Sequence, residues 1–473
     1  MSVLQAITTT GEHTVLEETL VQQLQTGLRG ALLRPGDDSY DAVRKIYNAM
    51  IDKRPALIVQ CAGAADVLTA VTFARTHNLL VAVRGGGHSV GGKSVCDSGV
   101  LIDLSPMKGI RVDPARRTAR AQPGLRLGEL DRETQAFGLA TPLGVIANTG
   151  IAGLTLGGGI GWLSGQYGLA CDNLLSVDVV TADGRFLTAS ASENTDLFWG
   201  VRGGGGNFGI VTSFEYRLHP VGPVLGGTVL YEMKKAWEVL RFLDKFAHEY
   251  PDELSVDIGF LTTPDGNLMV GITVCYSGSL GEGEKVLQPL RTFGTPIADF
   301  IRPMSYVEMQ SLLDENFPPG RLHYWKSNFL RVMSDDAIEV MLEYATTMPS
   351  PTSVVELQLM HGAASRIGCS ETAFAHRYEQ YDLLILSNWT DPADSEKNVR
   401  WTRAFWEAMQ PFVEQRVYVN NLGEEGDERD RAAYGSNYER LVALKNKYDP
   451  TNFFRLNQNI KPNTQAAKGA AEP

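Results

Sequence analysis

The spacing of hydrophobic and polar residues changes character near residue 220. Between about residues 55 and 218, short alternating or apolar runs are separated by Gly, Pro and Asp, which predicts a β-rich region. After the Pro-Val-Gly-Pro sequence at 220–223, amphipathic helices alternate with strands. We therefore predict an α+β chain with a first domain at 1–222, a middle domain at 223–414 and a C-terminal segment at 415–473, the β-rich core of the first domain covering about 53–222.

The same patterns predict individual elements along the chain. Residues 17–50 are expected to be helical on both sides of a turn at 34–38. Strands are predicted at 79–83, 100–104, 109–112, 118–122, 178–180, 186–188, 210–218, 354–360 and 383–389. Amphipathic helices are predicted at 127–137, 237–250, 337–346 and 395–412.

The stretch 434–462 is predicted to form a distinct helical unit. Ser436 followed by Glu439 has the spacing of a capping box, and Asp449-Pro450 is expected to end the helix. Leu441, Leu444 and Tyr448 then fall on one face.

Composition and charge exclude several classes of protein. With 43% hydrophobic and 21% charged residues, the chain of 473 residues has a globular composition. A net charge of −12 argues against nucleic acid or an anionic membrane as a partner. No apolar run reaches the about 18 residues of a membrane span, and the N-terminus does not have the pattern of a secretory signal. The five cysteines are odd in number, far apart and never in a CxxC pair. We expect a cytoplasmic protein with no metal site and no disulfide framework, and the sequence indicates no oligomeric state.

Three glycine-rich stretches are the candidate functional loops. The stretch at 87–94 matches GxxxxGKS, but a turn and a strand follow it where a P-loop requires a helix. The stretch at 204–209 matches GxGxxG, but an alternating strand follows it, so the dinucleotide fingerprint fails in the same way. The third stretch, at 153–161, matches no phosphate motif. Bare backbone N–H groups in three loops suit close approach to a pyrophosphate, although tight turns alone are the alternative for any one loop.

Several motifs together resemble one known family. RGGGHS at 84–89 is followed by PGLRLGELDRETQAFGLA, GLTLGGGIGWLSGQYGLACDN and DLFWGVRGGGGNFGIVTSFEYRLHP, and by YGSNYERLVALKNKYDPTNFFRLNQNI near the C-terminus. The sequence is similar to the berberine-bridge-enzyme-like branch of the vanillyl-alcohol-oxidase superfamily. The resemblance implies a PCMH-type FAD-binding domain at 1–222 to which the segment 415–473 returns. It also implies a substrate-binding domain at 223–414 with an antiparallel sheet covered by helices.

The resemblance also implies how FAD is held. His88 is expected to bond to the flavin 8α-methyl group, which suits a neutral nucleophilic imidazole. Ile146 stands where many relatives carry a second, cysteinyl attachment, so we expect covalent attachment through His88 only. The residues implied in cofactor binding are Arg84, Gly85, Gly86, Gly87, His88, Ser89, Thr149, Gly150, Gly153, Leu154, Gly157, Gly158, Gly159, Gly161, Gly206, Asn207, Val211, Asn457, Gln458 and Asn459.

The implied activity is hydride transfer from a small-molecule alcohol, amine or related C–H donor to flavin, with O2 reduced to H2O2. The catalytic candidates are Tyr418 as general base, Asn388 and Asn420, with Tyr434 as a weaker candidate. Glu356 and Gln358 share one strand face, near His361, and are further candidates; ordinary strand polar groups are the alternative. There are two alternative functions: a dehydrogenase that uses another electron acceptor, and a non-catalytic carrier of flavin or another ligand. A small residue near Thr149 favours an open path for O2.

Overall fold

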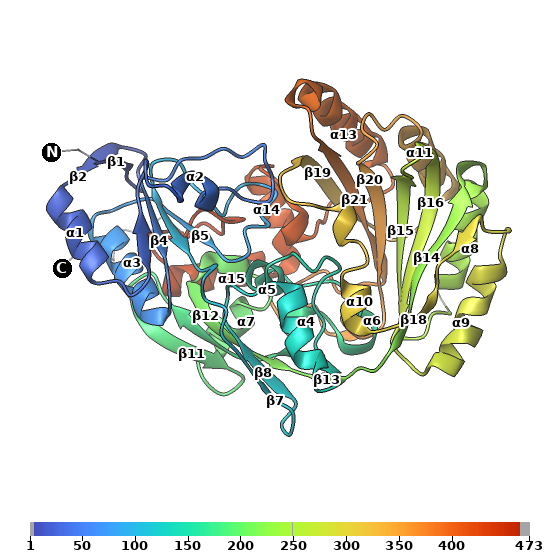
Figure 1. Cartoon of the computed structure of the whole chain (residues 1–473), viewed down its shortest axis with the longest axis horizontal. Helices are drawn as coiled ribbons and strands as arrows, with labels where there is room; N and C mark the ends of the chain where they lie inside the picture. The colour runs from blue at the N-terminus through green and yellow to red at the C-terminus, as the bar shows by residue number, and fades with distance from the viewer. Residues whose placement is uncertain (1–3, 248, 464–473) are drawn as a thin grey trace.

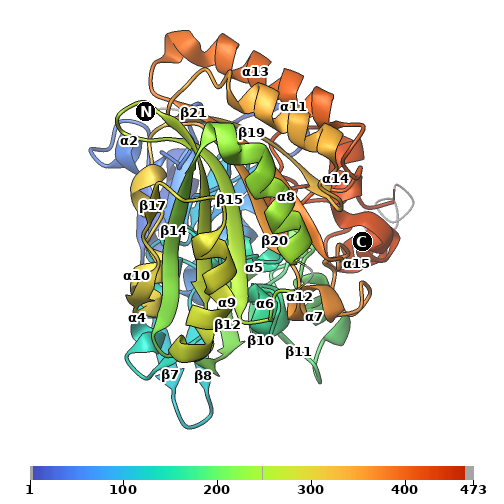
Figure 2. The same cartoon turned by 90° about the vertical axis from the view of Figure 1, so that its right-hand side faces the viewer.

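The computed structural model describes residues 4–247 and 249–463. Its elements gather into two bodies, one built on two smaller sheets and one on a single large sheet (Figure 1). The large sheet is antiparallel at every pairing, and its longer helices lie on the side away from the first body (Figures 1 and 2). The predicted α+β class, with a helix-covered antiparallel sheet, is confirmed.

The smaller sheet of the first body has four strands in the order β3-β4-β6-β5. The last three are parallel because α3 carries the chain from β4 back to the start of β5, while β3 pairs antiparallel with β4. One face of α3 is fully buried against this sheet. The elements are β3 (Ala31–Leu33), β4 (Leu57–Gln60), α3 (Ala64–Thr76), β5 (Val81–Arg84) and β6 (Val100–Asp103).

The second sheet of this body has five antiparallel strands in the order β11-β10-β12-β8-β7. The glycine-rich stretch at 87–94 lies between β5 and β6 of the smaller sheet, and the stretches at 153–161 and 204–209 precede β10 and β12 of this second sheet. The strands are β7 (Ile110–Asp113), β8 (Thr118–Ala121), β10 (Leu174–Val180), β11 (Phe186–Ser190) and β12 (Ile210–Arg217). The helices of this body include α1 (Glu18–Thr26), α2 (Tyr40–Val43), α4 (Leu127–Gln135), α5 (Ile151–Leu156), α6 (Ser164–Tyr167) and α7 (Thr195–Gly200).

The large sheet runs β17-β14-β16-β15-β20-β21-β19, with β18 paired to β14. Its strands are β14 (Val224–Glu232), β15 (Leu254–Thr262), β16 (Leu268–Tyr276), β17 (Ala298–Asp299), β18 (Arg302–Met304), β19 (Leu322–Leu330), β20 (Val354–Met360) and β21 (Gln380–Trp389). The outer face is covered by α8 (Ala236–Ala247), α9 (Leu280–Thr292), α11 (Asp335–Ala345) and α13 (Ser395–Met409).

Strand β20 shows how the two faces of this sheet differ. Val355, Leu357 and Leu359 pack into the core under the covering helices. Because strand residues alternate in direction, Glu356 and Gln358 point to the opposite face, toward the first body. The large sheet therefore presents polar side chains to the space between the two bodies.

The C-terminal helices α14 (Asp427–Tyr434) and α15 (Tyr438–Tyr448) return to the first body. The Lys445 ammonium, fully buried, donates to the carbonyl oxygens of Asn207 at 2.8 Å and Phe454 at 2.9 Å. Leu441, Leu444 and Tyr448 are buried, which confirms the predicted inner face of the helix. We propose that the domain boundaries lie between residues 222 and 223 and between residues 414 and 415.

Some predicted elements differ from the structure. Between residues 27 and 50 only α2 is helical and β3 is a strand, because edge pairing with β4 competes with helix formation there. The prediction of a capping box at Ser436 is wrong, because Ser436 lies in a 3-10 turn. Helix α15 begins one residue later than predicted, after Asn437, and has no side-chain cap.

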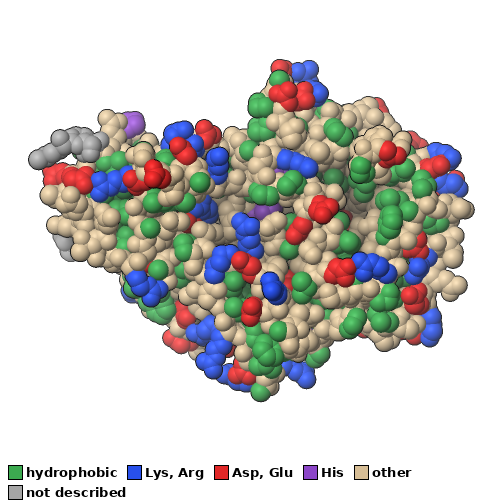
Figure 3. Space-filling model, in the orientation of Figure 1, with side chains coloured by type: hydrophobic (Ala, Val, Ile, Leu, Met, Phe, Trp, Pro, Cys, Tyr) green, Lys and Arg blue, Asp and Glu red, His purple; other side chains and the backbone are tan. Residues whose placement is uncertain are grey.

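The surface carries both signs of charge. On the face in Figure 3, Lys and Arg side chains are interspersed with Asp and Glu. Among the described residues, no helix combines the length and the apolar character needed to cross a bilayer.

Candidate functional site

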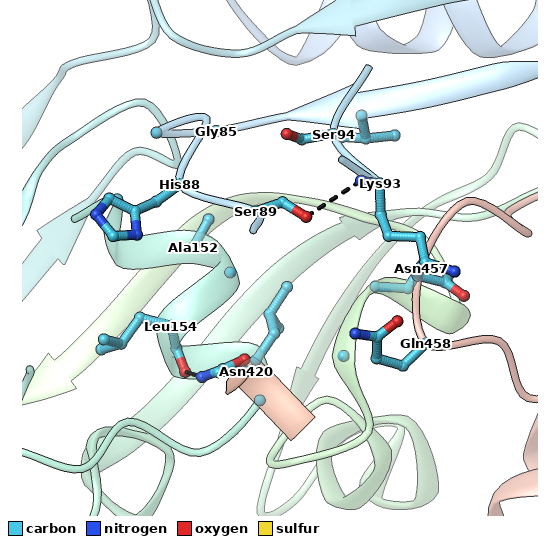
Figure 4. Close-up of a pocket in the computed structure, with 18 of the residues that line it drawn as sticks. Gly85, His88, Ser89, Lys93, Ser94, Ala152, Leu154, Asn420, Asn457 and Gln458 are labelled. Carbon is cyan, nitrogen blue, oxygen red and sulfur yellow. Dashed lines mark hydrogen bonds between the residues drawn. The ribbon is translucent and has the colours of Figure 1, made fainter. Parts of the chain in front are cut away.

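Two adjoining cavities lie in the molecule, the first within the first body and the second between the two bodies. The first is lined by the three glycine-rich stretches and the C-terminal segment at 456–458, as Figure 4 shows for part of it. The second lies between the inner face of the large sheet and the loop at 144–149. Both cavities are lined by His88, Thr149, Leu154 and Asn420. These four residues mark the junction, and each of them was singled out from the sequence.

The first cavity depends on glycines in two different ways. Gly86 and Gly150 approach so closely that a Cβ on Gly86 would lie 2.4 Å from the Cα of Gly150. A Cβ on Gly153 or Gly206, by contrast, would meet nothing within 4 Å, because both positions face the open cavity. The first pair holds the two loops together, and the second pair leaves room for a ligand.

We expect Gly86→Ala to lower the free energy of unfolding by about 1–3 kcal/mol, the usual cost of overpacking, because backbone must move. The matched variant Gly153→Ala lies in α5 and should leave stability within about 1 kcal/mol. It should still lower the ratio of flavin to protein absorbance, because its methyl group enters the cavity. Urea unfolding and visible spectra measure the two effects, and equal stability of both variants would contradict the assignment.

His88 lies at the junction as a buried, neutral imidazole. Burial lowers the pKa of its ring to about 4, and its Nε2 has no hydrogen-bond partner among the described residues. Its ring stacks on Tyr47, with centroids 3.9 Å apart and planes inclined by 19°. Tyr47 stacks in turn on His323 at 4.5 Å. A neutral, unpartnered ring nitrogen in a fixed orientation is suited to act as a nucleophile.

The polar groups around the first cavity fit FAD. Several buried polar atoms that line it have no partner among the described residues, as expected where ribityl hydroxyls, phosphates or the polar edge of a flavin ring would bind. These atoms are His88 Nε2, Ser94 Oγ, Asn457 Oδ1 and Gln458 Oε1.

Most of the predicted cofactor residues line this cavity. Those that do are Gly85, Gly86, Gly87, His88, Ser89, Thr149, Gly150, Gly153, Leu154, Gly157, Gly206, Val211, Asn457 and Gln458. The predicted residues outside the lining are Arg84, Gly158, Gly159, Gly161, Asn207 and Asn459.

Two of the outlying residues support the site from behind. Arg84 forms a buried ion pair with Asp103, with Nη2 2.6 Å from Oδ2, and so braces the start of the RGGGHS loop. The amide of Asn207 donates to the carbonyl oxygens of Gly204 and Gln458. Both side chains are used within the protein, and their place in the cofactor site is indirect.

Lys93 and Ser94 belong to the P-loop-like sequence and line the first cavity as well (Figure 4). No helix follows them, since residues 91–98 form turns and bends that lead to β6. The GxGxxG stretch likewise leads into strand β12. The failure of both nucleotide motifs is therefore confirmed, although Lys93 and Ser94 were not predicted to line the cavity.

Tyr418 and Asn420 form a pair at the second cavity. The Tyr418 hydroxyl oxygen accepts from the Gly159 N–H at 2.8 Å and from Asn420 Nδ2 at 2.6 Å. Asn420 Nδ2 also donates to the carbonyl oxygen of Leu154 at 3.0 Å (Figure 4). Burial raises the pKa of the Tyr418 phenol, an effect that these two donors oppose. With both donors in place, the hydroxyl proton is left to point elsewhere.

The other two catalytic candidates lie away from the second cavity. Asn388 is fully buried; it donates to the carbonyl oxygen of Thr352 at 2.6 Å and accepts from Arg321 at 3.2 Å. It is absent from the described lining of both cavities. Tyr434 lines the first cavity and donates to the carbonyl oxygen of Gln458 at 2.6 Å. Neither position supports a role in substrate chemistry.

A carboxylate that was not predicted from the sequence lies six residues before Asn388, on the same face of the strand. Asp382, on β21, lines the second cavity and is 3% exposed. Burial raises its pKa to about 7, although Ser327 and Asn421 donate to its oxygens at 2.7 Å each. Glu356 lines the same cavity, as the alternation on β20 indicated. Asp382 could have been found by extending the predicted strand at 383–389 by one residue toward its N-terminus.

Comparison with known proteins agrees with this site. Residues 55–190 match the family model described as FAD binding domain, and 417–461 match the one described as Berberine and berberine like. A FAD-linked oxidoreductase of Dictyostelium discoideum is 34% identical, over 94% of this chain and 97% of its own. A carbohydrate oxidase of Microdochium nivale is 30% identical, over 90% of this chain and 92% of its own. The crystal structure of 6-hydroxy-D-nicotine oxidase from Arthrobacter nicotinovorans superposes with a TM-score of 0.85 at 31% identity, covering 92% of this chain and 98% of its own.

The fold, the glycine-lined cavity and the adjoining second cavity define an FAD-linked oxidoreductase. The chain belongs to the berberine-bridge-enzyme-like family, with its PCMH-type FAD-binding domain, as the sequence motifs implied.

Proposed function

We propose that this protein is an oxidase that takes hydride from a small-molecule alcohol, amine or related C–H donor and passes the electrons to O2, giving H2O2. The observation that carries the proposal is the junction of the two cavities at His88, Thr149, Leu154 and Asn420. Bound FAD supplies the hydride acceptor and the means of reacting with O2. A substrate in the second cavity would lie next to that cofactor, and this proximity and fixed orientation would favour the reaction.

Tyr418 is the proposed group that first receives the substrate O–H or N–H proton. Its oxygen is held by the Gly159 and Asn420 donors, so its position is fixed without any help from substrate. Because burial raises the pKa of its phenol, a bare phenolate is disfavoured before substrate binds. Tyr418 therefore needs a nearby base that takes its own proton as the substrate proton arrives.

Asp382 is the proposed final acceptor of that proton. It lines the same cavity as Tyr418, and its charge acts on the Tyr418 phenol. A pKa of about 7 lets this carboxyl give up and take back a proton near neutral pH. Asp382 lies on the same face of the same strand as Asn388, the candidate that the sequence indicated on this strand.

We further propose that FAD is attached through His88 alone and that O2 reaches the flavin past Thr149. Ile146 lines the second cavity at the position where relatives carry cysteine, and no cysteine lines either cavity in the described part of the chain. Thr149 lines both cavities, as expected of a residue that controls access between them.

Single attachment predicts that acid-precipitated protein stays yellow and that one tryptic peptide, containing His88, carries the flavin mass. In His88→Ala the precipitate should be colourless and the FAD should appear in the supernatant. Mass spectrometry of the digest measures both results. A flavin mass on any other peptide, or a yellow His88→Ala precipitate, would contradict single attachment.

The oxidase proposal is tested by following both half-reactions. A panel of alcohols, aldoses and amines is mixed with the protein under argon, and bleaching of the flavin absorbance is recorded. The protein reduced by dithionite is then mixed with O2, and H2O2 is measured with a peroxidase-coupled assay. Bleaching with slow reoxidation would indicate a dehydrogenase instead, and no bleaching by any compound would favour a non-catalytic carrier.

A further inference from the structure

The second cavity is acidic, and nothing in its described lining balances that charge. Glu356 and Asp382 both line it, and Glu356 is only partly buried. No Lys or Arg is among the described residues of this lining. The one basic side chain there, His88, is neutral because burial lowers its pKa to about 4. The space therefore favours a positively charged occupant.

Strand register brings a third carboxyl, that of Asp257, to the same face of the large sheet. Asp257 on β15 is opposite Gln358 on β20, and Gln358 is opposite Asp382 on β21. Glu356 is the diagonal neighbour of both acids, within reach of long side chains. Asp257 and Glu356 are hydrogen-bonded to one another, and the second oxygen of Asp257 has no partner among the described residues. Two carboxyls joined in this way share a proton and leave one negative charge to be matched.

A second, independent observation indicates that a polar ligand belongs in this cavity. Tyr47 lines it and is 6% exposed, yet its hydroxyl has no hydrogen-bond partner among the described residues. The indole N–H of Trp325, also in the lining, has none either. Buried polar atoms without partners are costly, and a ligand with hydrogen-bonding groups would satisfy them.

The remaining walls are apolar. Leu313, Phe317, Leu384 and Leu386 line the cavity together with the rings of Tyr47 and Trp325. Aromatic faces attract cations as well as apolar rings, so they suit the same occupant as the carboxyls. A sugar, with hydroxyls on every side, would leave many of its groups facing these walls without partners.

We propose, building on the oxidase function above, that the substrates are amines bound as ammonium ions on an apolar, ring-bearing skeleton, with Glu356 and Asp382 holding the cation. One N–H proton of the ammonium passes through the Tyr418 hydroxyl to the Asp382 carboxylate, which leaves a neutral amine. The C–H bond beside nitrogen then breaks, its hydrogen leaves with both electrons to the flavin, and the product is an iminium ion. O2 takes up the two electrons with two protons as H2O2.

The experiment uses the flavin-loaded protein and pairs of compounds that differ in charge at constant shape. Benzylamine is compared with benzyl alcohol, and 2-phenylpyrrolidine with 2-phenyltetrahydrofuran; cellobiose represents the sugars. Binding is followed under argon by changes in the visible flavin spectrum, and turnover by bleaching. We expect each amine to bind at least about 10-fold more tightly than its neutral partner, the usual worth of a hydrogen bond to a charged group.

Variants locate the effect. Glu356→Gln should weaken binding of the amines by about 10–100-fold and change binding of 2-phenyltetrahydrofuran by less than about 2-fold. Asp382→Asn should also weaken binding of the amines. It replaces Glu356→Gln in this test if Glu356→Gln does not retain flavin. Glu232→Gln is the matched control, since Glu232 is an exposed acid on β14 of the same sheet. It should bind both compounds like the parent.

The outcomes separate this inference from the oxidase function. Equal binding of amine and neutral partner, loss of both in Glu356→Gln, or bleaching by cellobiose and by no amine would overturn amine selection. In the last case the oxidoreductase function would stand. Tight amine binding with no H2O2 from the reduced protein would instead support amine selection and contradict the oxidase.

Discussion

Tyr418→Phe should slow anaerobic flavin reduction by about 10²–10⁴-fold, the range found for a positioned acid–base group. Phenylalanine keeps the ring but removes the oxygen that accepts from Gly159 and Asn420, and with it the path for the substrate proton. Reoxidation of the reduced flavin by O2 should change little, because that half-reaction does not use the substrate proton. Stopped-flow absorbance under argon, followed by mixing with O2, separates the two rates.

Two further variants make this result specific. Tyr40→Phe removes another buried tyrosine hydroxyl, one that donates to the Pro55 carbonyl oxygen, and should reduce its flavin at the parental rate. Asn388→Ala removes a side chain bonded to Thr352 and Arg321 outside both cavities, so we expect a change in stability and an unaffected reduction rate. If Tyr418→Phe reduces its flavin as fast as the parent, the proton goes directly to a carboxyl, and Asp382→Asn becomes the decisive variant.

The parts of this site that could be predicted are those in which the backbone itself does the work. Gly86 and Gly150 leave no space for any Cβ, and Gly153 and Gly206 leave space for the ligand, so glycine is required in the sequence at each position. His88 lies within one of these loops and was identified with it. Such requirements act on short stretches, and short stretches are what a sequence motif records.

The substrate cavity was harder to predict because it forms across distant strands. Strands 354–360 and 383–389 were expected, yet β14, β15, β16 and β19 were not, although they belong to the same sheet. Their patterns are interrupted by Gly226 and Gly227 in β14 and by Asp257 in β15. Asp257 lies on the same face of the sheet as Glu356 and Gln358, which line the cavity. Polar residues on this face therefore help to form the site and also interrupt the strand pattern.

Asn388 illustrates the same limit more sharply. It shares a face of β21 with Asp382, Leu384 and Leu386, because every second residue points the same way. The alternation of side chains predicts which face of the strand a residue lies on. It does not predict how far along the strand the cavity extends. That distance depends on where the loops of the first body meet the sheet, which is a property of the tertiary structure alone.

Lys445→Met should lower the free energy of unfolding by about 3–5 kcal/mol, the usual result of removing one partner of a buried ion pair. The Lys445 Nζ and Asp449 Oδ2 are 2.7 Å apart, and both side chains are completely buried. The same ammonium donates to the carbonyl oxygens of Asn207 and Phe454. Methionine fills a similar volume but leaves a buried carboxylate without its cation and two carbonyl groups without their donor.

The loss of stability in Lys445→Met should also affect the flavin site, because Asn207 connects Lys445 to that site. Its backbone carbonyl is held by Lys445, and its side chain bonds to the carbonyl of Gln458, which lines the first cavity. We therefore expect the flavin spectrum of Lys445→Met to change at a lower urea concentration than that of the parent. Recording flavin absorbance and far-ultraviolet circular dichroism along one urea titration measures both changes.

Lys447→Met is the matched control, two residues along the same helix. Lys447 pairs with Asp196, but the two side chains are 59% and 40% exposed, so the pair should contribute no more than about 1 kcal/mol. Adding Asp449→Asn to Lys445→Met removes the stranded charge and keeps an oxygen for the N–H groups of Phe453 and Phe454, which now donate to Asp449. The double variant should regain part of the lost stability. A Lys445→Met protein as stable as Lys447→Met would show that the C-terminal helix is held to the flavin domain by its apolar face alone.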